Sequence, residues 1–207
     1  RSRPGHLERL LLNRATPDET VLGLVPSLRA EALLELIAQN ESRLLRCPKI
    51  IEVLYLNPAT RMSTAKRAVE LAIRHHIPLD LPAYNEIAAG LGAEVKFADP
   101  GDQALAEAAE DEAFNTAYLD GKDRDETAIP LEEGEEGTEE EVDLRKVGSL
   151  LGLTITQKIR LSLIGSAYHR SLLLRDPNRI VAMAAVKSPT IKETEVIGVT
   201  QSRSVND

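Results

Sequence analysis

The sequence contains no tryptophan, and aromatic residues make up only 3% of its 207 residues, although 43% are hydrophobic. Aromatic and β-branched residues are enriched in strands, whereas leucine and alanine favour helices. A chain of this length and hydrophobic content can form a sizeable core. Because that core would be almost entirely aliphatic and rich in leucine and alanine, we predict an all-α globular fold.

Cysteine and long hydrophobic runs are also scarce. The single cysteine, Cys47, excludes an intramolecular disulfide bond, so nothing indicates an oxidising compartment. No hydrophobic run approaches the length of a membrane span, and the N-terminal sequence RSRPGHLERL lacks the apolar core of a signal peptide. We therefore predict a cytoplasmic protein with no membrane partner.

The sequence lacks a recognisable metal or catalytic motif. His75 and His76 are adjacent, so their side chains leave a helix in different directions, and neither HExxH nor a Cys/His cluster occurs. Cys47 lies in LRCPKI, a stretch typical of a turn between helices, which disfavours a catalytic thiol. We predict no metal, no cofactor and no catalytic residue, and hence a protein that is not an enzyme.

Charge is distributed very unevenly. Residues 1–98 contain 13 Lys/Arg and 11 Asp/Glu, residues 99–146 contain 4 and 18, and residues 147–207 contain 8 and 4. The acidic stretch LDGKDRDETAIPLEEGEEGTEEEV has few apolar residues and no periodicity, a composition that favours disorder. We predict N-terminal helical repeats over 1–98, a helix over 99–118, a disordered acidic loop over 119–142 and C-terminal helical repeats over 143–207.

A similar phrase occurs three times in the sequence. LLLNRATPDETVLGLV, LYLNPATRMSTAKRAV and AAVKSPTIKETEVIGV align on Thr16, Thr60 and Thr190. A glutamate follows the first and third threonines by three residues, as in a capping box, and Pro58 and Pro189 favour the end of the preceding helix. Each phrase therefore predicts a helix, a tight turn and a second helix, with the three threonines as structural helix caps.

Hydrophobic periodicity and turn residues place the remaining helices. The predicted helices are 6–12, 17–25, 29–39, 41–46, 49–56, 63–75, 82–91, 103–118, 143–151, 156–164, 168–174 and 178–187. Because the chain starts at Arg1 and ends in residues typical of a helix start, we expect it to be part of a longer protein.

These motifs resemble the repeats of HEAT-like helical proteins, in particular uncharacterised bacterial proteins with variant repeats. The likeness covers the chain apart from its acidic middle, and the 44-residue spacing from Thr16 to Thr60 is within the range of HEAT and armadillo units. The resemblance implies an α-solenoid of stacked helical hairpins that acts as an interaction scaffold. Some HEAT-like proteins are enzymes, such as DNA alkylation-repair glycosylases, whose pockets resemble aromatic cages. This sequence departs from them, because it has no tryptophan, two phenylalanines and four tyrosines, so an aromatic base pocket is not expected.

Several arginines lie at or near the predicted repeat turns, where a solenoid would align them as one ridge. These are Arg43, Arg46, Arg61, Arg67, Arg170, Arg175 and Arg179. Such a ridge would suit an acidic peptide, a phosphorylated ligand or nucleic acid, although most surface arginines are simply solvated. The acidic loop would then compete with an acidic ligand for the ridge.

Two functions follow from these observations. Our first hypothesis is a scaffold or regulatory adaptor that binds another protein on a surface formed by helical repeats. The alternative is an arginine-lined binder of nucleic acid or of a phosphorylated or acidic ligand. Apolar ends of a helical stack would also favour self-association.

Overall fold

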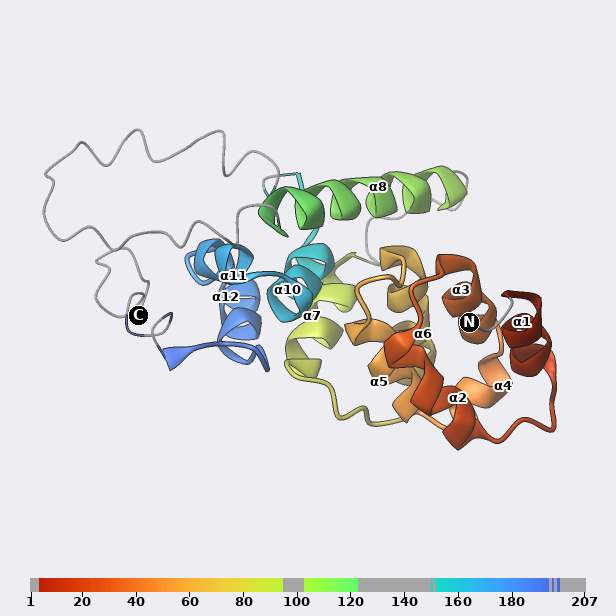
Figure 1. Ribbon diagram of the computed structural model, residues 1–207. Helices are drawn as coiled ribbons and strands as arrows, with labels where there is room; N and C mark the ends of the chain where they lie inside the picture. Colours follow the sequence, from red (N-terminus) through yellow and green to blue (C-terminus); the bar gives the residue numbers. More distant parts are fainter. Residues whose placement is uncertain are drawn as a thin grey trace, which may run out of the picture. The chain divides into compact units, whose positions relative to one another are not determined.

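A computed structural model describes residues 4–94, 103–122, 150, 152–193, 195 and 197 (Figure 1). In these residues the secondary structure consists of α-helices and one 3-10 turn, with no strand, which confirms the all-α fold class. Two of the predicted helices coincide with observed ones, α4 (Glu41–Arg46) and α5 (Lys49–Leu56). The chain divides into two compact units, an N-terminal unit of residues 1–84 and a C-terminal unit of residues 85–207.

The N-terminal unit is built around α5. Its helices, besides α4 and α5, are α1 (Pro4–Leu12), α2 (Asp18–Leu24), the 3-10 turn η1 (Val25–Ser27), α3 (Glu31–Ala38) and α6 (Met62–Arg74). Helix α5 contacts α2, η1, α3, α4 and α6. Its residues Ile50, Ile51 and Leu54 are fully buried because their spacing places them on one side of the helix. This aliphatic helix forms the core on which the others pack.

The first two copies of the repeated phrase form closely similar turns. Between α1 and α2, the Asn13 side-chain oxygen accepts from the backbone N–H of Ala15 at 2.9 Å. Between α5 and α6, Asn57 accepts from the N–H of Ala59 at the same distance. In both turns the N–H of the following threonine also bonds to the asparagine carbonyl. The shared residues thus produce the same local fold, in which an asparagine side chain replaces a backbone acceptor.

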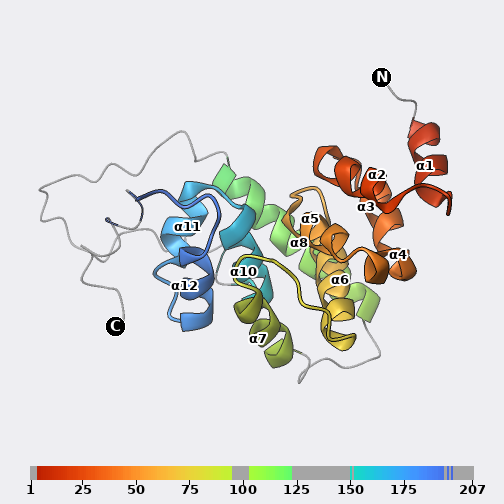
Figure 2. The same ribbon diagram turned by 90° about the horizontal axis from the view of Figure 1, so that it is seen from below.

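The C-terminal unit is centred on α10 (Ile155–Ile164). Helices α8 (Gln103–Lys122), α11 (Ala167–Leu173) and α12 (Arg179–Val186) each contact it, and α10, α11 and α12 lie side by side in Figure 2. Its core is again mostly aliphatic, except that the fully buried Arg160 places its guanidinium 5.1 Å from the centroid of the Phe114 ring. This distance is typical of a cation–π contact.

Helix α7 (Tyr84–Glu94) belongs mainly to the C-terminal unit, whereas the sequence predicts that residues up to 98 belong to the first domain. The reason is the close packing of Gly90. A β-carbon at this glycine would lie 3.2 Å from side-chain atoms of Thr156 and Ile159 on α10. In addition, Lys187 pairs with Glu86 at 2.6 Å. Both contacts join α7 to the helices that follow in sequence.

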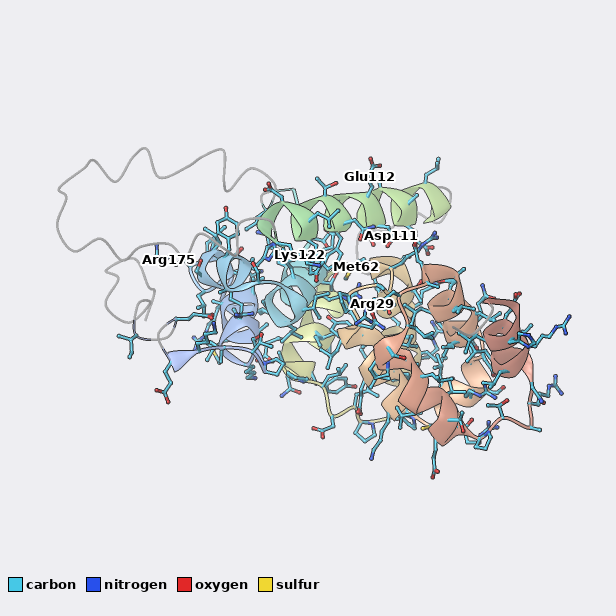
Figure 3. The ribbon with its side chains drawn as sticks, in the orientation of Figure 1. Arg29, Met62, Asp111, Glu112, Lys122 and Arg175 are labelled. Carbon is cyan, nitrogen blue, oxygen red and sulfur yellow. The ribbon has the colours of Figure 1, made fainter. Side chains whose placement is uncertain are left out.

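Helix α8 continues to Lys122, four residues beyond the predicted end at residue 118, so the predicted acidic loop begins too early. The extension is explained by contacts of the last turn with α11. The carbonyl oxygen of Gly121 accepts a hydrogen bond from the hydroxyl of Ser166, the N-cap of α11. Within α8 itself, Lys122, labelled in Figure 3, lies 5.9 Å from the ring centroid of Tyr118, one turn earlier. The rest of the predicted loop, residues 123–142, and most of the predicted helix 143–151 lie outside the described residues.

None of the helices that the structure describes combines the length and the apolar character that a membrane-crossing helix needs.

Candidate functional site

On the part of the N-terminal unit that the structure describes, three hollows are bordered by α3. The largest, the α1–α3–α4 groove, has a volume of 570 Å³. A second, of 430 Å³, lies along α3 beside Arg61, and a third, of 200 Å³, lies between the end of α3 and α6 beside Arg67. Gln39, which follows α3, lines all three. Candidate binding surfaces are therefore gathered around one helix.

The α1–α3–α4 groove has apolar and basic walls. It is lined by Leu11, Leu12, Arg14, Leu36, Gln39, Asn40, Ser42, Arg43 and Arg46. Leu12 ends α1 and is 59% exposed, which is unusual for a large hydrophobic side chain in this chain. Two of the predicted site residues, Arg43 and Arg46, are thus brought together here, one turn apart on α4.

Arg43 is a structural residue of the groove wall, because its side chain is only 2% exposed. Its guanidinium donates to the carbonyl oxygens of Leu11 at 3.0 Å and of Asn13 and Thr16 at 3.2 Å. Its Nε atom also lies 3.1 Å from a carboxylate oxygen of Asp18. One buried side chain therefore ties α4 to the turn between α1 and α2.

Arg46 occupies the rim of the groove, with 60% of its side chain exposed. It donates through Nε and Nη2 to the two carboxylate oxygens of Asp18, the second at 2.8 Å. This two-point hydrogen bond, together with the charges of Arg46 and Arg43, lowers the pKa of Asp18 below its ordinary value. Near neutral pH, Asp18 is therefore ionised and forms ion pairs with both Arg43 and Arg46.

Arg61 and Arg67 line the other two hollows and are also paired. Arg61 pairs with Glu31, and Arg67 pairs with Glu35 at 2.6 Å. Burial raises the pKa of Glu35, but hydrogen bonds from Thr64 and Arg67 outweigh it, so the pKa lies below the ordinary value. These pairs join α6 to α3 across the surface and neutralise the charge of both arginines.

The lowered pKa values predict that acid destabilises the N-terminal unit. Because Asp18 and Glu35 bind protons more weakly when folded than when unfolded, their contribution is present above the ordinary carboxyl pKa of about 4 and is lost below it. We expect the urea midpoint of the unit to fall between about pH 5 and about pH 3. The Asp18→Asn, Glu35→Gln double variant should show a smaller fall, measured by circular dichroism; an unchanged pH dependence would contradict the assignment.

The remaining predicted arginines belong to the C-terminal unit. Arg170 is buried, and its guanidinium pairs with Glu195 at 2.9 Å and donates to the Thr190 hydroxyl at 2.8 Å. Arg175, labelled in Figure 3, and Arg179 are exposed and lie between α11 and α12 and at the start of α12. Five of the seven predicted arginines are thus engaged by carboxylates of their own unit.

The three threonines differ from their predicted role as helix caps. The residue that caps α2 is Pro17, and the Thr16 hydroxyl instead donates to the carbonyl of Leu10 at 2.6 Å, which closes the preceding helix. Thr60 is buried, and α6 has Arg61 as its N-cap without a side-chain bond. Thr190 accepts from Arg170. In the first two turns the helix starts one residue later than a capping box on the threonine requires, so the N-cap is the residue after the threonine, Pro17 or Arg61.

Sequence reasoning missed the other residues of the groove, notably Arg14 and Leu12. The only signal available was the apolar Leu12 at the end of a helical pattern, directly before the turn.

In the part of the chain that the structure describes, no group of three or more His, Cys, Asp or Glu side chains is placed to hold a metal ion. No family model matches the chain, and searches of curated proteins and of solved structures also give no match.

Proposed function

We propose that this chain is a non-enzymatic, cytoplasmic scaffold built as a solenoid of helical hairpins, and that it binds another protein through the α1–α3–α4 groove. The observation that carries the proposal is the exposed Leu12 beside Leu36 in the largest of the three hollows that α3 borders. Protein interfaces combine such an apolar centre with a polar and arginine-containing rim. The neighbouring Arg46, Ser42 and Asn40 supply that rim.

A nucleic-acid ligand is the second choice because its affinity depends on free positive charge. In the N-terminal unit, Arg46, Arg61 and Arg67 are already paired with carboxylates, so Arg14 is the one arginine of the groove without a carboxylate partner among the described residues, fewer free charges than a phosphate backbone needs. A phosphate backbone would have to displace these partners, which are covalently part of the same unit. A phosphate backbone gains no favourable contact from the apolar wall of the groove, whereas a leucine-type side chain of a protein partner can bury apolar surface against it.

Substitution of Leu12 tests the proposal. A carboxylate at this position, in Leu12→Asp, would place an unsatisfied charge in the apolar centre of the interface and should weaken capture of the partner by more than about tenfold. Capture is measured by affinity purification from a cell extract treated with nuclease, at low and at moderate salt. The fold should be unaffected, because Leu12 is largely exposed.

Leu119→Asp on α8 is the matched control, since Leu119 is a similarly exposed leucine of the C-terminal unit. This variant should capture the same partner as the unchanged chain. Equal capture by all three proteins would exclude the groove as the binding surface. Recovery of nucleic acid that is lost at moderate salt would instead support the alternative function.

A further inference from the structure

The α1–α3–α4 groove differs in charge from the two hollows beside it. Each of the smaller hollows includes glutamate in its lining, Glu41 in one and both Glu31 and Glu35 in the other. The residues that line the α1–α3–α4 groove include three arginines and three leucines and no carboxylate. A ligand in this groove therefore meets positive charge and apolar surface together.

Most of the free positive charge comes from Arg14. The guanidinium of Arg43 donates hydrogen bonds to backbone carbonyls in and beside the turn between α1 and α2, and two nitrogens of Arg46 donate to Asp18. Arg14 is exposed and has no ion pair with any residue within the described ranges. Its guanidinium, and the Nη1 atom of Arg46, are positively charged donors of the groove that remain for a ligand.

The apolar and basic parts of the groove are close together along the chain. Leu12 is the last residue of α1 and Arg14 lies two residues later in the turn, and both line the same 570 Å³ groove with Leu36 of α3. A volume of this size accommodates a few side chains rather than a whole folded surface. The occupant that fits is a short peptide segment in which a carboxylate stands close to a leucine-type side chain.

We propose that the α1–α3–α4 groove recognises a short acidic segment of its partner protein that contains at least one large aliphatic residue. Arg14 is the principal contact for the carboxylate, assisted by Arg46, and Leu12 and Leu36 contact the aliphatic side chain. The proposal rests on the proposed function and adds the chemistry of the partner to it. Charge complementarity carries the step, because Asp18 pairs with Arg43 and Arg46 but no carboxylate among the described residues pairs with Arg14, which lines the groove.

Selection from a random-peptide display library on the full chain provides the test, since it needs no known partner. Enriched peptides should contain Asp or Glu beside Leu, Ile or Met. Each is then synthesised with a fluorescent label, together with a version in which amides replace the carboxylates. Fluorescence polarisation should show that the amide version binds about tenfold more weakly, the loss expected for one charged hydrogen bond.

Three variants locate the binding. Arg14→Ala should weaken the enriched acidic peptides by about tenfold, and Leu12→Asp should abolish their binding. Arg74→Ala is the control, because Arg74 is an exposed arginine of the same unit that ends α6 and does not line the groove. The affinity of the Arg74→Ala variant for the enriched peptides should stay within about twofold of that of the unchanged chain.

The outcomes separate the two proposals. If no peptide is enriched, or if the enriched peptides are neutral or basic, the acidic specificity is wrong. If peptides lose binding to Leu12→Asp but not to Arg14→Ala, the groove binds protein segments without reading their charge, so the proposed function stands alone. If neither variant affects binding, both the groove and its specificity are wrong. An oligonucleotide that displaces the peptides and itself requires Arg14 would overturn the choice of a protein ligand.

Discussion

Replacement of Arg43 by methionine is expected to destabilise the N-terminal unit by about 3 kcal/mol. Methionine keeps most of the length and apolar contact of the side chain but removes every donor. The carbonyl oxygens of Leu11, Asn13 and Thr16 lose their guanidinium partner, and Asp18 loses one of its two arginines. Because Asp18 retains Arg46 and is partly exposed, the loss should be at the lower end of the range for broken buried ion pairs.

Arg46→Ala is the control for this experiment, because it removes the other partner of the same carboxylate. Arg46 is 60% exposed, so its pair is worth at most about 1 kcal/mol. Urea unfolding of the full chain gives the change in stability. Hydrogen exchange followed by mass spectrometry shows where it occurs, and faster exchange is expected in α1 and α2. If the two substitutions had equal effects, the view of Arg43 as the structural arginine would be wrong.

This pair of arginines also shows where prediction from sequence ends. The bounds of α4 and α5 follow from Asn40 as the N-cap of α4 and from the proline that precedes α5, signals that are local in sequence. Arg43 and Arg46 are three residues apart on one short helix and share a partner, so no local pattern distinguishes the buried one from the exposed one. Burial depends on where the distant turn at residues 13–17 is placed, about thirty residues earlier in the chain.

The prediction of an arginine ridge left out the carboxylates that pair with these arginines, and the reason is again that the partners are distant in sequence. Glu31 and Glu35 lie one turn apart on α3, whereas Arg61 is the N-cap of α6 and Arg67 lies within it, so the pairs form only when the two helices pack together. Charge counts over whole segments cannot show such pairing, since they give the net value alone. The two turns with Asn13 and Asn57, in contrast, could be predicted because their hydrogen bonds span only two or three residues.

The second large effect is expected from Gly121→Ala in α8. A β-carbon at Gly121 would lie 2.0 Å from Nε2 of His169 and 2.3 Å from Cε1, well inside contact distance. Alanine is otherwise the better helix former by up to about 1 kcal/mol. Helix propensity alone would make the variant more stable, but we expect the collision with His169 to prevail and to lower the free energy of unfolding of the C-terminal unit by about 3 kcal/mol. Urea unfolding of the full chain measures it.

The loss should be large because the imidazole of His169 cannot move aside. Its Nδ1 atom accepts from the backbone N–H of Ser166 at 2.9 Å, so Nε2 carries the hydrogen and donates to the carbonyl of Ala117 at 3.0 Å. The ring also stacks on Tyr118, and the side chain is 1% exposed. Ser166 and His169 form the N-terminal cap of α11. Displacing the ring would therefore open the cap of one helix and its contact with another.

Two comparisons decide whether this contact is the cause. Gly92→Ala in α7 has no atom within 4 Å of the new β-carbon and should stabilise the same unit by up to about 1 kcal/mol. In a double-mutant cycle, Gly121→Ala should cost much less when His169 is already alanine, because the colliding ring is absent. If Gly121→Ala matched Gly92→Ala, or cost the same with and without the imidazole, then α8 would not be held on α11 through His169. A loss that disappears in the double variant would establish that the imidazole of His169, which joins α11 to α8 beside the Ser166–Gly121 hydrogen bond, is the cause.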